Sequence, residues 1–202
     1  LRWALLVARC SPKMQKTLIC GFAHTVGLLH DGTALQWGGT ERGQREDFPQ
    51  DRKFEAVSCG DAHTVGLLHD GTALQWGGTD MGQREDFPQD RKFEAVSCGV
   101  AHTVGLLHDG TAVQWGDTER GQREDFPQDR KFEAVSCGGT HTVGLLHDGT
   151  ALQWGGTDMG QREDFPQDRK FEAVSCGFAH TVGLLHDGTA LQWGGTERGQ
   201  RE

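Results

Sequence analysis

The chain has 202 residues and a formal net charge of -9, and its share of hydrophobic residues suits a folded domain rather than a disordered segment. Residues 1–19 carry four Lys and Arg side chains and no acidic one, so removing these four charges leaves -13 on the rest of the chain. A surface this acidic repels nucleic-acid phosphates at long range, which disfavours DNA or RNA as the partner.

The N-terminal segment, residues 1–14, differs from everything that follows it. Its apolar run, residues 3–8, is far shorter than the ~20 residues that a membrane helix needs, and no small-residue cleavage site is evident. We therefore expect no membrane segment. The chain begins at Leu1 without an initiator Met and stops at Glu202 within a repeat, so we expect it to be a piece of a longer protein.

From residue 15 to residue 202 the chain is a repeat array with a period of 39 residues. Each copy contains a near-identical Cys-Gly-x-x-His-Thr-Val-Gly-Leu-Leu-His-Asp-Gly motif, which opens at Cys20, Cys59, Cys98, Cys137 and Cys176. A unit this short cannot bury its own apolar residues. Neighbouring units must therefore cover one another's faces.

Within one repeat the pattern predicts three β-strands and no helix. In the second repeat the runs are residues 54–59, residues 64–68, which are apolar or small on both faces, and residues 72–76. Asp70-Gly71 predicts a hairpin between the last two runs, with a type I′ turn in which both central residues have positive φ. The glycine inside the second run leaves too few residues for a helix of normal length.

The polar connector, residues 82–92, carries the chain to the start of the next unit, and Phe87 is the residue expected to anchor it. The predicted fold class is therefore all-β, a β-propeller of radially arranged sheets. Five three-stranded blades are expected, at residues 15–38, 54–77, 93–116, 132–155 and 171–194.

One repeat carries the string Gly60-x-x-His63-Thr64…Leu67…Asp70-Gly71…Trp76-Gly77…Gly82-Gln83. This string resembles the repeat of the regulator of chromosome condensation family, and it recurs over about nine-tenths of the chain. The resemblance implies a propeller, typically of seven blades. The unit is shorter than the family's usual one and is similar to the three-stranded blades of the propeller-type β-lactamase inhibitory proteins. Five blades at seven-blade angles cover about 5/7 of a circle, so we expect an open arc or a piece of a larger ring.

Membership of this family does not settle function, because its members include an exchange factor for a small GTPase, chromatin binders, modules attached to ubiquitin ligases, a UV-B photoreceptor and enzyme inhibitors. The photoreceptor's tryptophan motif is missing, since the matching position holds Phe22, Asp61, Val100, Gly139 and Phe178. The exchange factor works through features of individual blades, whereas these blades are nearly identical. Both activities are therefore disfavoured.

The cysteines and histidines raise the question of metal binding. Cys-x-x-x-His occurs five times, and thiolate with imidazole is a common zinc ligand set. Each pair belongs to a separate blade, however, so four ligands do not converge. We expect the His to bond loop backbone and the Cys to pack as a small apolar residue, with no metal and no cofactor. Disulfides between equivalent positions are not expected either, which favours a reducing, intracellular compartment, cytoplasm or nucleus.

No catalytic constellation is predicted. The second histidines precede the Asp-Gly turns and are expected at hairpin tips, at His30, His69, His108, His147 and His186. A His-Asp neighbour pair in five copies lacks a uniquely placed nucleophile, so the chain is not expected to be an enzyme. The strand-end tryptophans are expected to wedge between blades, with a binding ladder as the alternative, at Trp37, Trp76, Trp115, Trp154 and Trp193.

The copies differ mainly at two pairs of positions, one after Cys-Gly and one before Gly-Gln. In an up-down-up blade both pairs fall at the end opposite the Asp-Gly turn, so they share one propeller face. The predicted partner-binding residues are Phe22, Asp61, Val100 and Phe178 from the first pair, and Glu41, Arg42, Asp80, Met81, Glu119, Arg120, Asp158, Met159, Glu197 and Arg198 from the second. Drift in a recently duplicated array is the alternative, since the second pair alternates between Glu-Arg and Asp-Met.

These observations lead us to expect a non-catalytic protein-interaction module that binds a protein of unknown identity through the variable face. The alternatives are a structural or spacer array, or a regulatory propeller attached to a ubiquitin-ligase or GTPase-regulator domain.

Overall fold

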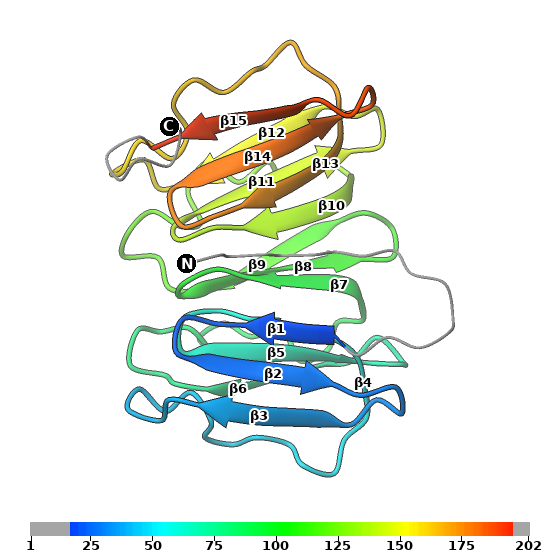
Figure 1. Ribbon diagram of the computed structural model, residues 1–202, viewed down its shortest axis with the longest axis vertical. Coiled ribbons are helices and arrows are strands. Elements are labelled where there is room, and N and C mark those ends of the chain that lie inside the picture. The colour runs from blue at the N-terminus through cyan, green and yellow to red at the C-terminus, as the bar shows by residue number, and fades with distance from the viewer. Residues whose placement is uncertain (1–16, 196–202) are drawn as a thin grey trace.

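In a computed structural model, which describes residues 17–195, the chain forms fifteen strands in five antiparallel sheets of three (Figure 1). The first two sheets comprise β1 (Thr17–Cys20), β2 (His24–Leu28) and β3 (Ala34–Gly38), then β4 (Phe54–Cys59), β5 (His63–Leu68) and β6 (Ala73–Gly77). The next two comprise β7 (Phe93–Cys98), β8 (His102–Leu107) and β9 (Ala112–Gly116), then β10 (Phe132–Cys137), β11 (His141–Leu146) and β12 (Ala151–Gly155). The fifth comprises β13 (Phe171–Cys176), β14 (His180–Leu185) and β15 (Ala190–Gly194). The prediction of an all-β chain with three strands per repeat is confirmed.

The hairpin between the second and third strands of each sheet is present, but its turn is not type I′. In the second sheet the Leu68 amide donates to the Thr72 carbonyl at 2.8 Å, which leaves a three-residue loop. Gly71 has a φ of +80°, whereas Asp70 is not among the described residues with positive φ. The Asp70 carboxylate accepts a hydrogen bond from the Thr72 amide at 2.9 Å, and this local bond stabilises the turn. Only the glycine therefore needs the left-handed conformation.

The middle strand of each internal sheet is covered on both faces, as its apolar sequence predicts. Val65 and Leu67 of β5 are buried, at 0% and 2% exposure. Gly66 lies between them because the Phe54 ring occupies the space of a side chain: a Cβ on Gly66 would lie 2.4 Å from Phe54 Cε1. The glycine in this strand is therefore required by close packing rather than by a turn.

The core lies between consecutive sheets, in four clusters. At the interface of the second and third sheets, Val65 packs with Phe93 and Trp115. Trp115 is fully buried, and its Nε1 donates to Gln75 Oε1 of the preceding sheet at 2.8 Å. The predicted connector anchor, Phe87, places its ring centroid 5.6 Å from that of Trp115. The prediction of tryptophans wedged between blades is confirmed at these interfaces.

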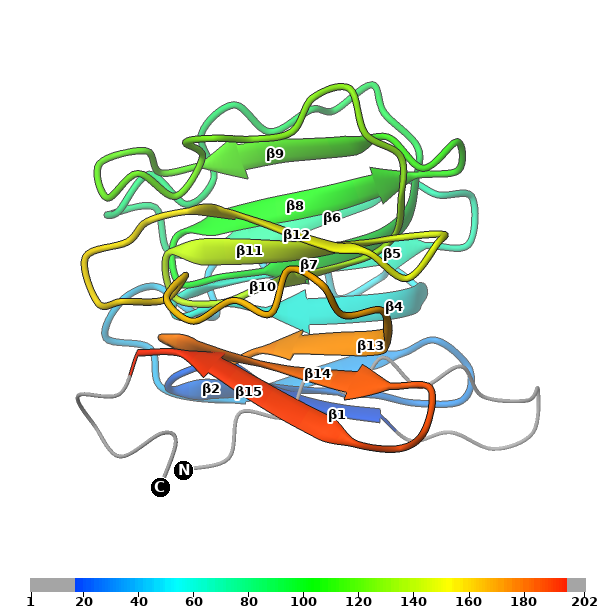
Figure 2. The ribbon, with the colours of Figure 1, turned by 90° about the horizontal axis from the view of Figure 1, so that it is seen from above.

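The array does not close into a ring within the described residues. None of the four core clusters joins the fifth sheet to the first (Figures 1 and 2). Trp37 in the first sheet is 45% exposed, whereas its four equivalents are fully buried. The prediction that Trp37 also wedges between blades is therefore wrong, because no described sheet precedes its own. The five sheets form an open arc.

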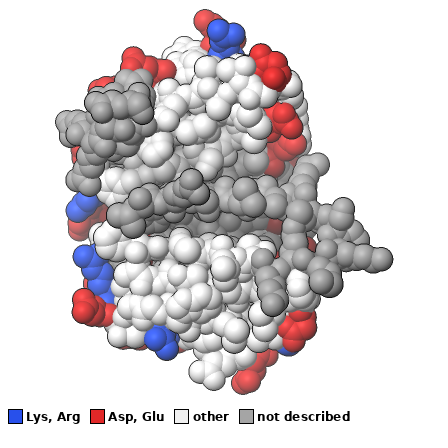
Figure 3. Space-filling model, viewed as in Figure 1, with Lys and Arg blue, Asp and Glu red and all other residues white. Residues whose placement is uncertain are grey.

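The two ends of each sheet carry different features. In Figure 1 the strand β1 leads to the variable loops on the left, and β2 leads to the Asp-Gly turns on the right. Most of the charged side chains in view in Figure 3 lie toward the margins of the molecule, and the described residues in view between them are largely uncharged. Residues 17–195 contain no helix that is long and apolar enough to cross a membrane.

Candidate functional site

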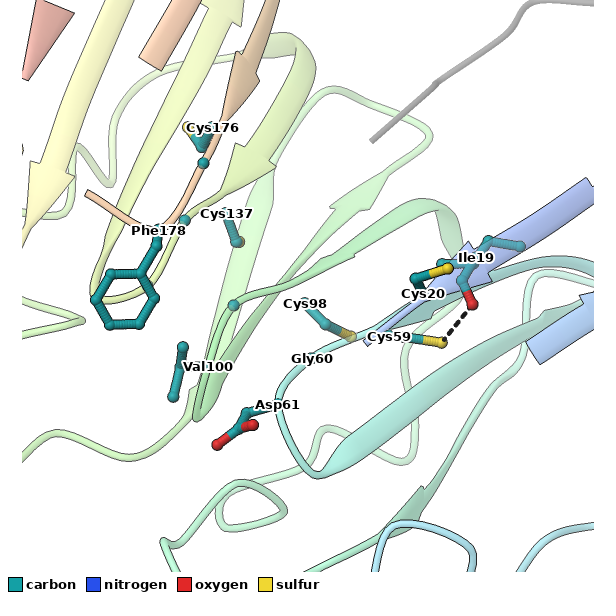
Figure 4. A pocket seen from close by; sticks show the side chains of 14 residues that line it. Ile19, Cys20, Cys59, Gly60, Asp61, Cys98, Val100, Cys137, Cys176 and Phe178 are labelled. Atoms are coloured by element: carbon teal, nitrogen blue, oxygen red, sulfur yellow. Dashed lines mark hydrogen bonds between the residues drawn. The ribbon is translucent and has the colours of Figure 1, made fainter. Parts of the chain in front are cut away.

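The first strands of the five sheets line the axis of the arc, and their cysteines enclose a small axial cavity of about 40 Å³ (Figure 4). Successive strands are joined there, since the Cys98 amide donates to Ser58 Oγ at 2.9 Å and the Cys137 amide to Ser97 Oγ at the same distance. Burial raises the pKa of the Cys98 thiol to about 11. Cys59, Cys98, Cys137 and Cys176 are buried with their pKa raised, so they act as small apolar side chains, as predicted, whereas Cys20 in the first sheet is exposed and does not.

The sequence predicts that the histidines of the Cys-x-x-x-His pairs bond loop backbone, but in the first four sheets they bond a threonine of the next sheet. The predicted bonding partner is therefore wrong. His63 Nε2 lies 2.9 Å from Thr103 Oγ1, which is 40 residues further along the chain. His63 is fully buried, and burial lowers its pKa to about 3. Its Nδ1 has no hydrogen-bond partner among the described residues. The equivalent bonds of His24, His102 and His141 also join successive sheets, and burial lowers the pKa of these three side chains as well.

The first variable pair lies at one end of the axis. Backbone hydrogen bonds pass from sheet to sheet there: the Asp61 amide donates to the Val100 carbonyl, the Val100 amide to Gly139, and the Gly139 amide to Phe178, at 3.4, 3.2 and 2.9 Å. In Figure 4 the side chains of Asp61, Val100 and Phe178 point toward the same end of the axis. These equivalent positions therefore form one continuous rim around the axial mouth.

Residues of both variable pairs meet in a pocket of about 440 Å³ at this end. Its lining residues are Phe22, Asp61, Val100 and Phe178 from the first pair, Arg42, Asp80, Met81 and Arg120 from the second, and Gln83. Four other predicted binding residues do not line it, namely Glu41, Glu119, Asp158 and Met159. Glu197 and Arg198 lie outside the described residues. The pocket walls thus combine apolar, cationic and anionic side chains.

Asp61 has an unusual position in this pocket. It is 7% exposed, and its Oδ2 accepts a hydrogen bond from Arg42 Nη1 at 2.8 Å. Its other carboxylate oxygen, Oδ1, is buried and has no hydrogen-bond partner among the described residues. Burial raises the pKa of Asp61, and the Arg42 charge opposes that effect. The carboxylate is therefore only half satisfied.

Sequence comparison of the repeats could not find Gln83, because this glutamine occurs in every copy. Its side chain is 1% exposed, and its Oε1 accepts a hydrogen bond from the Met81 amide at 2.9 Å. The residue fixes the loop that carries the second variable pair. In the sequence, this glutamine is recognisable only because every repeat has the same Gly-Gln dipeptide. A search for positions that differ between repeats therefore misses it.

No protein-family model matches the sequence, and no curated protein matches it significantly. The fold, however, is similar to solved structures. The CRINKLY ectodomain of the receptor kinase ACR4 from Arabidopsis thaliana has a TM-score of 0.72 and 22% identity, covering 89% of this chain and 64% of that one. Prp20p from Saccharomyces cerevisiae has a TM-score of 0.72 and 18% identity, covering 88% and 57%. Yeast RCC1 (Prp20) bound to Kap60 has a TM-score of 0.70 and 19% identity, covering 88% and 55%.

These similarities show the fold. Its five sheets have the fold of part of these propellers of the regulator of chromosome condensation type, which the repeat motif resembles. The chain spans less than two thirds of the length of each of these three structures.

Proposed function

We propose that this chain is a non-catalytic protein-binding module that captures its partner in the pocket formed by the variable residues. One observation carries the proposal: in an array of nearly identical sheets, eight of the residues that differ between the copies line one pocket. Phe22, 68% exposed, and the half-buried Phe178 supply apolar anchors beside charged groups, a composition typical of the energetic centres of protein interfaces.

The comparison with Prp20 supports a binding role in general terms, because a protein of this fold forms a complex with Kap60. The partner of the present chain is a different question, since likeness of fold does not transfer partners. The localisation in a reducing compartment remains part of the proposal and rests on the cysteine pattern of the sequence.

The proposal is tested by capture of proteins from a cell lysate on the immobilised chain, with the bound proteins identified and their affinities measured. Phe22→Ala combined with Phe178→Ala should weaken capture of a specific partner about tenfold, because interface energy concentrates in a few aromatic anchors. The matched control is His69→Ser combined with His147→Ser, two exposed positions beside the Asp-Gly turns at the other end. This control should leave capture unchanged.

Two outcomes would contradict the proposal. If the turn-side variant abolishes capture, the binding surface lies on the side of the Asp-Gly turns. If the wild-type chain captures no specific partner, the spacer interpretation is favoured, with the repeat differences arising from drift. A regulatory role beside a ubiquitin-ligase or GTPase-regulator domain would add effects on that domain without moving the binding site.

A further inference from the structure

Asp61 is the only acidic residue at its position in the repeat. The other four copies carry Phe22, Val100, Gly139 and Phe178 there. A carboxylate buried to this extent is costly unless both of its oxygens are bonded, and Oδ1 has no partner among the described residues. Asp61 lines the pocket and can still accept a hydrogen bond from a donor that a bound partner supplies.

Arg42 holds this carboxylate loosely. A single guanidinium nitrogen contacts a single carboxylate oxygen, Nη1 to Oδ2 at 2.8 Å, although the guanidinium can bond both oxygens of a carboxylate in parallel. The Arg42 side chain is 56% exposed. Because most of the guanidinium side chain is already in contact with water, Arg42 can move to solvent when another cation takes its place on Asp61.

We propose that the pocket accepts an arginine side chain of the partner protein, which replaces Arg42 on the Asp61 carboxylate. This inference rests on the proposed function and names the chemistry of the partner. The incoming guanidinium bonds both carboxylate oxygens, while its aliphatic stem contacts the apolar walls formed by Phe22, Val100 and Phe178. The aromatic rings add a cation–π attraction, and Arg42 moves to solvent.

The charge of the whole chain favours the same partner. Its net charge of -9 attracts basic segments at long range and raises their rate of encounter. Long-range attraction alone does not select a site, however. The inference therefore predicts a dependence on Asp61 that other acidic residues do not share.

The test measures the binding of a fluorescein-labelled nona-arginine peptide to the purified chain by fluorescence anisotropy, at about 0.15 M salt to screen the general field. Asp61→Asn keeps the shape of the side chain and removes its charge, and it should weaken binding about tenfold. The control is Asp129→Asn, which removes the same charge at an exposed connector position that does not line the pocket. It should change the affinity less than about twofold. Arg42→Gln should strengthen binding severalfold, because the competing guanidinium is gone.

Three results would overturn the inference: no binding by the wild-type chain, equal losses in the Asp61 and Asp129 variants, or weaker binding after Arg42→Gln. Thermal melts of each variant establish that it is folded. The lysate experiment separates this inference from the proposed function. If Asp61→Asn leaves partner capture intact while Phe22→Ala with Phe178→Ala reduces it, the arginine inference fails and the binding module stands.

Discussion

Replacing Trp115 with alanine tests how the array is held together. The indole is fully buried between the second and third sheets and contacts Phe87 and Phe93, with ring centroids 5.6 Å away in both cases. Its Nε1 donates to Gln75 Oε1 at 2.8 Å. Trp115→Ala therefore opens a cavity at an interface and removes a hydrogen bond that crosses it.

The expected loss is about 3–5 kcal/mol of unfolding free energy, the usual cost of truncating a buried aromatic side chain. The unpaired Gln75 oxygen accounts for about 1 kcal/mol of that sum. The total loss is a large share of the ~5–15 kcal/mol that stabilises a typical domain. Urea denaturation followed by circular dichroism measures the loss, with the slope of the transition checked for a change in cooperativity.

Trp37→Ala is the matched control, since the same residue type at the same repeat position is 45% exposed there. Less apolar area is lost, so the cost should be about 1–2 kcal/mol. If the two variants lose the same free energy, or if Trp115→Ala costs less than about 1 kcal/mol, Trp115 is not buried between sheets. The tryptophans would then be available as the binding ladder that the sequence left open.

Three further outcomes are expected. Gly66→Ala should destabilise the chain by about 1–3 kcal/mol in the same urea assay, because the new Cβ would lie 2.4 Å from Phe54 Cε1. Gly27→Ala, whose closest contact is 3.2 Å from Trp37, should cost less, and equal costs would contradict this packing argument. Stability should fall as the pH drops below about 6.5, because the folded-state pKa of His63 is about 3 and the unfolded state therefore takes up the proton first. The slope reaches about 1.4 kcal/mol per pH unit for each such histidine, and a His63→Gln variant with an unchanged pH profile would refute the assignment. Finally, elemental analysis should find no stoichiometric zinc and a chelator should leave the melting curve unchanged, since a structural zinc would contribute folding free energy; one zinc per chain would overturn the structural role of the Cys-His pairs.

The candidate site shows how far repeat comparison reaches. Variation between copies selects Asp61 and Phe178, and strand direction predicts that the loops carrying them share one end. Comparison of the repeats does not reveal that Arg42 bonds one oxygen of Asp61 and that the other oxygen lacks a partner among the described residues, because Arg42 and Asp61 belong to different repeats. Pairings of that kind depend on the angle between sheets, which no single repeat encodes.

The sequence by itself determines the three-stranded unit, its period of 39 residues and the apolar faces of its strands, because these follow from local spacing and side-chain alternation. Only the tertiary structure decides what each repeat does in its place. His63 bonds Thr103, 40 residues away, and Trp115 bonds Gln75 across the same separation. Near-identical sequences thus acquire different environments: Trp37 is exposed and Trp115 is buried, since one lies at an end of the arc and the other between two sheets. The physical reason is that a repeat specifies both of its faces but not whether a neighbour is present to cover them.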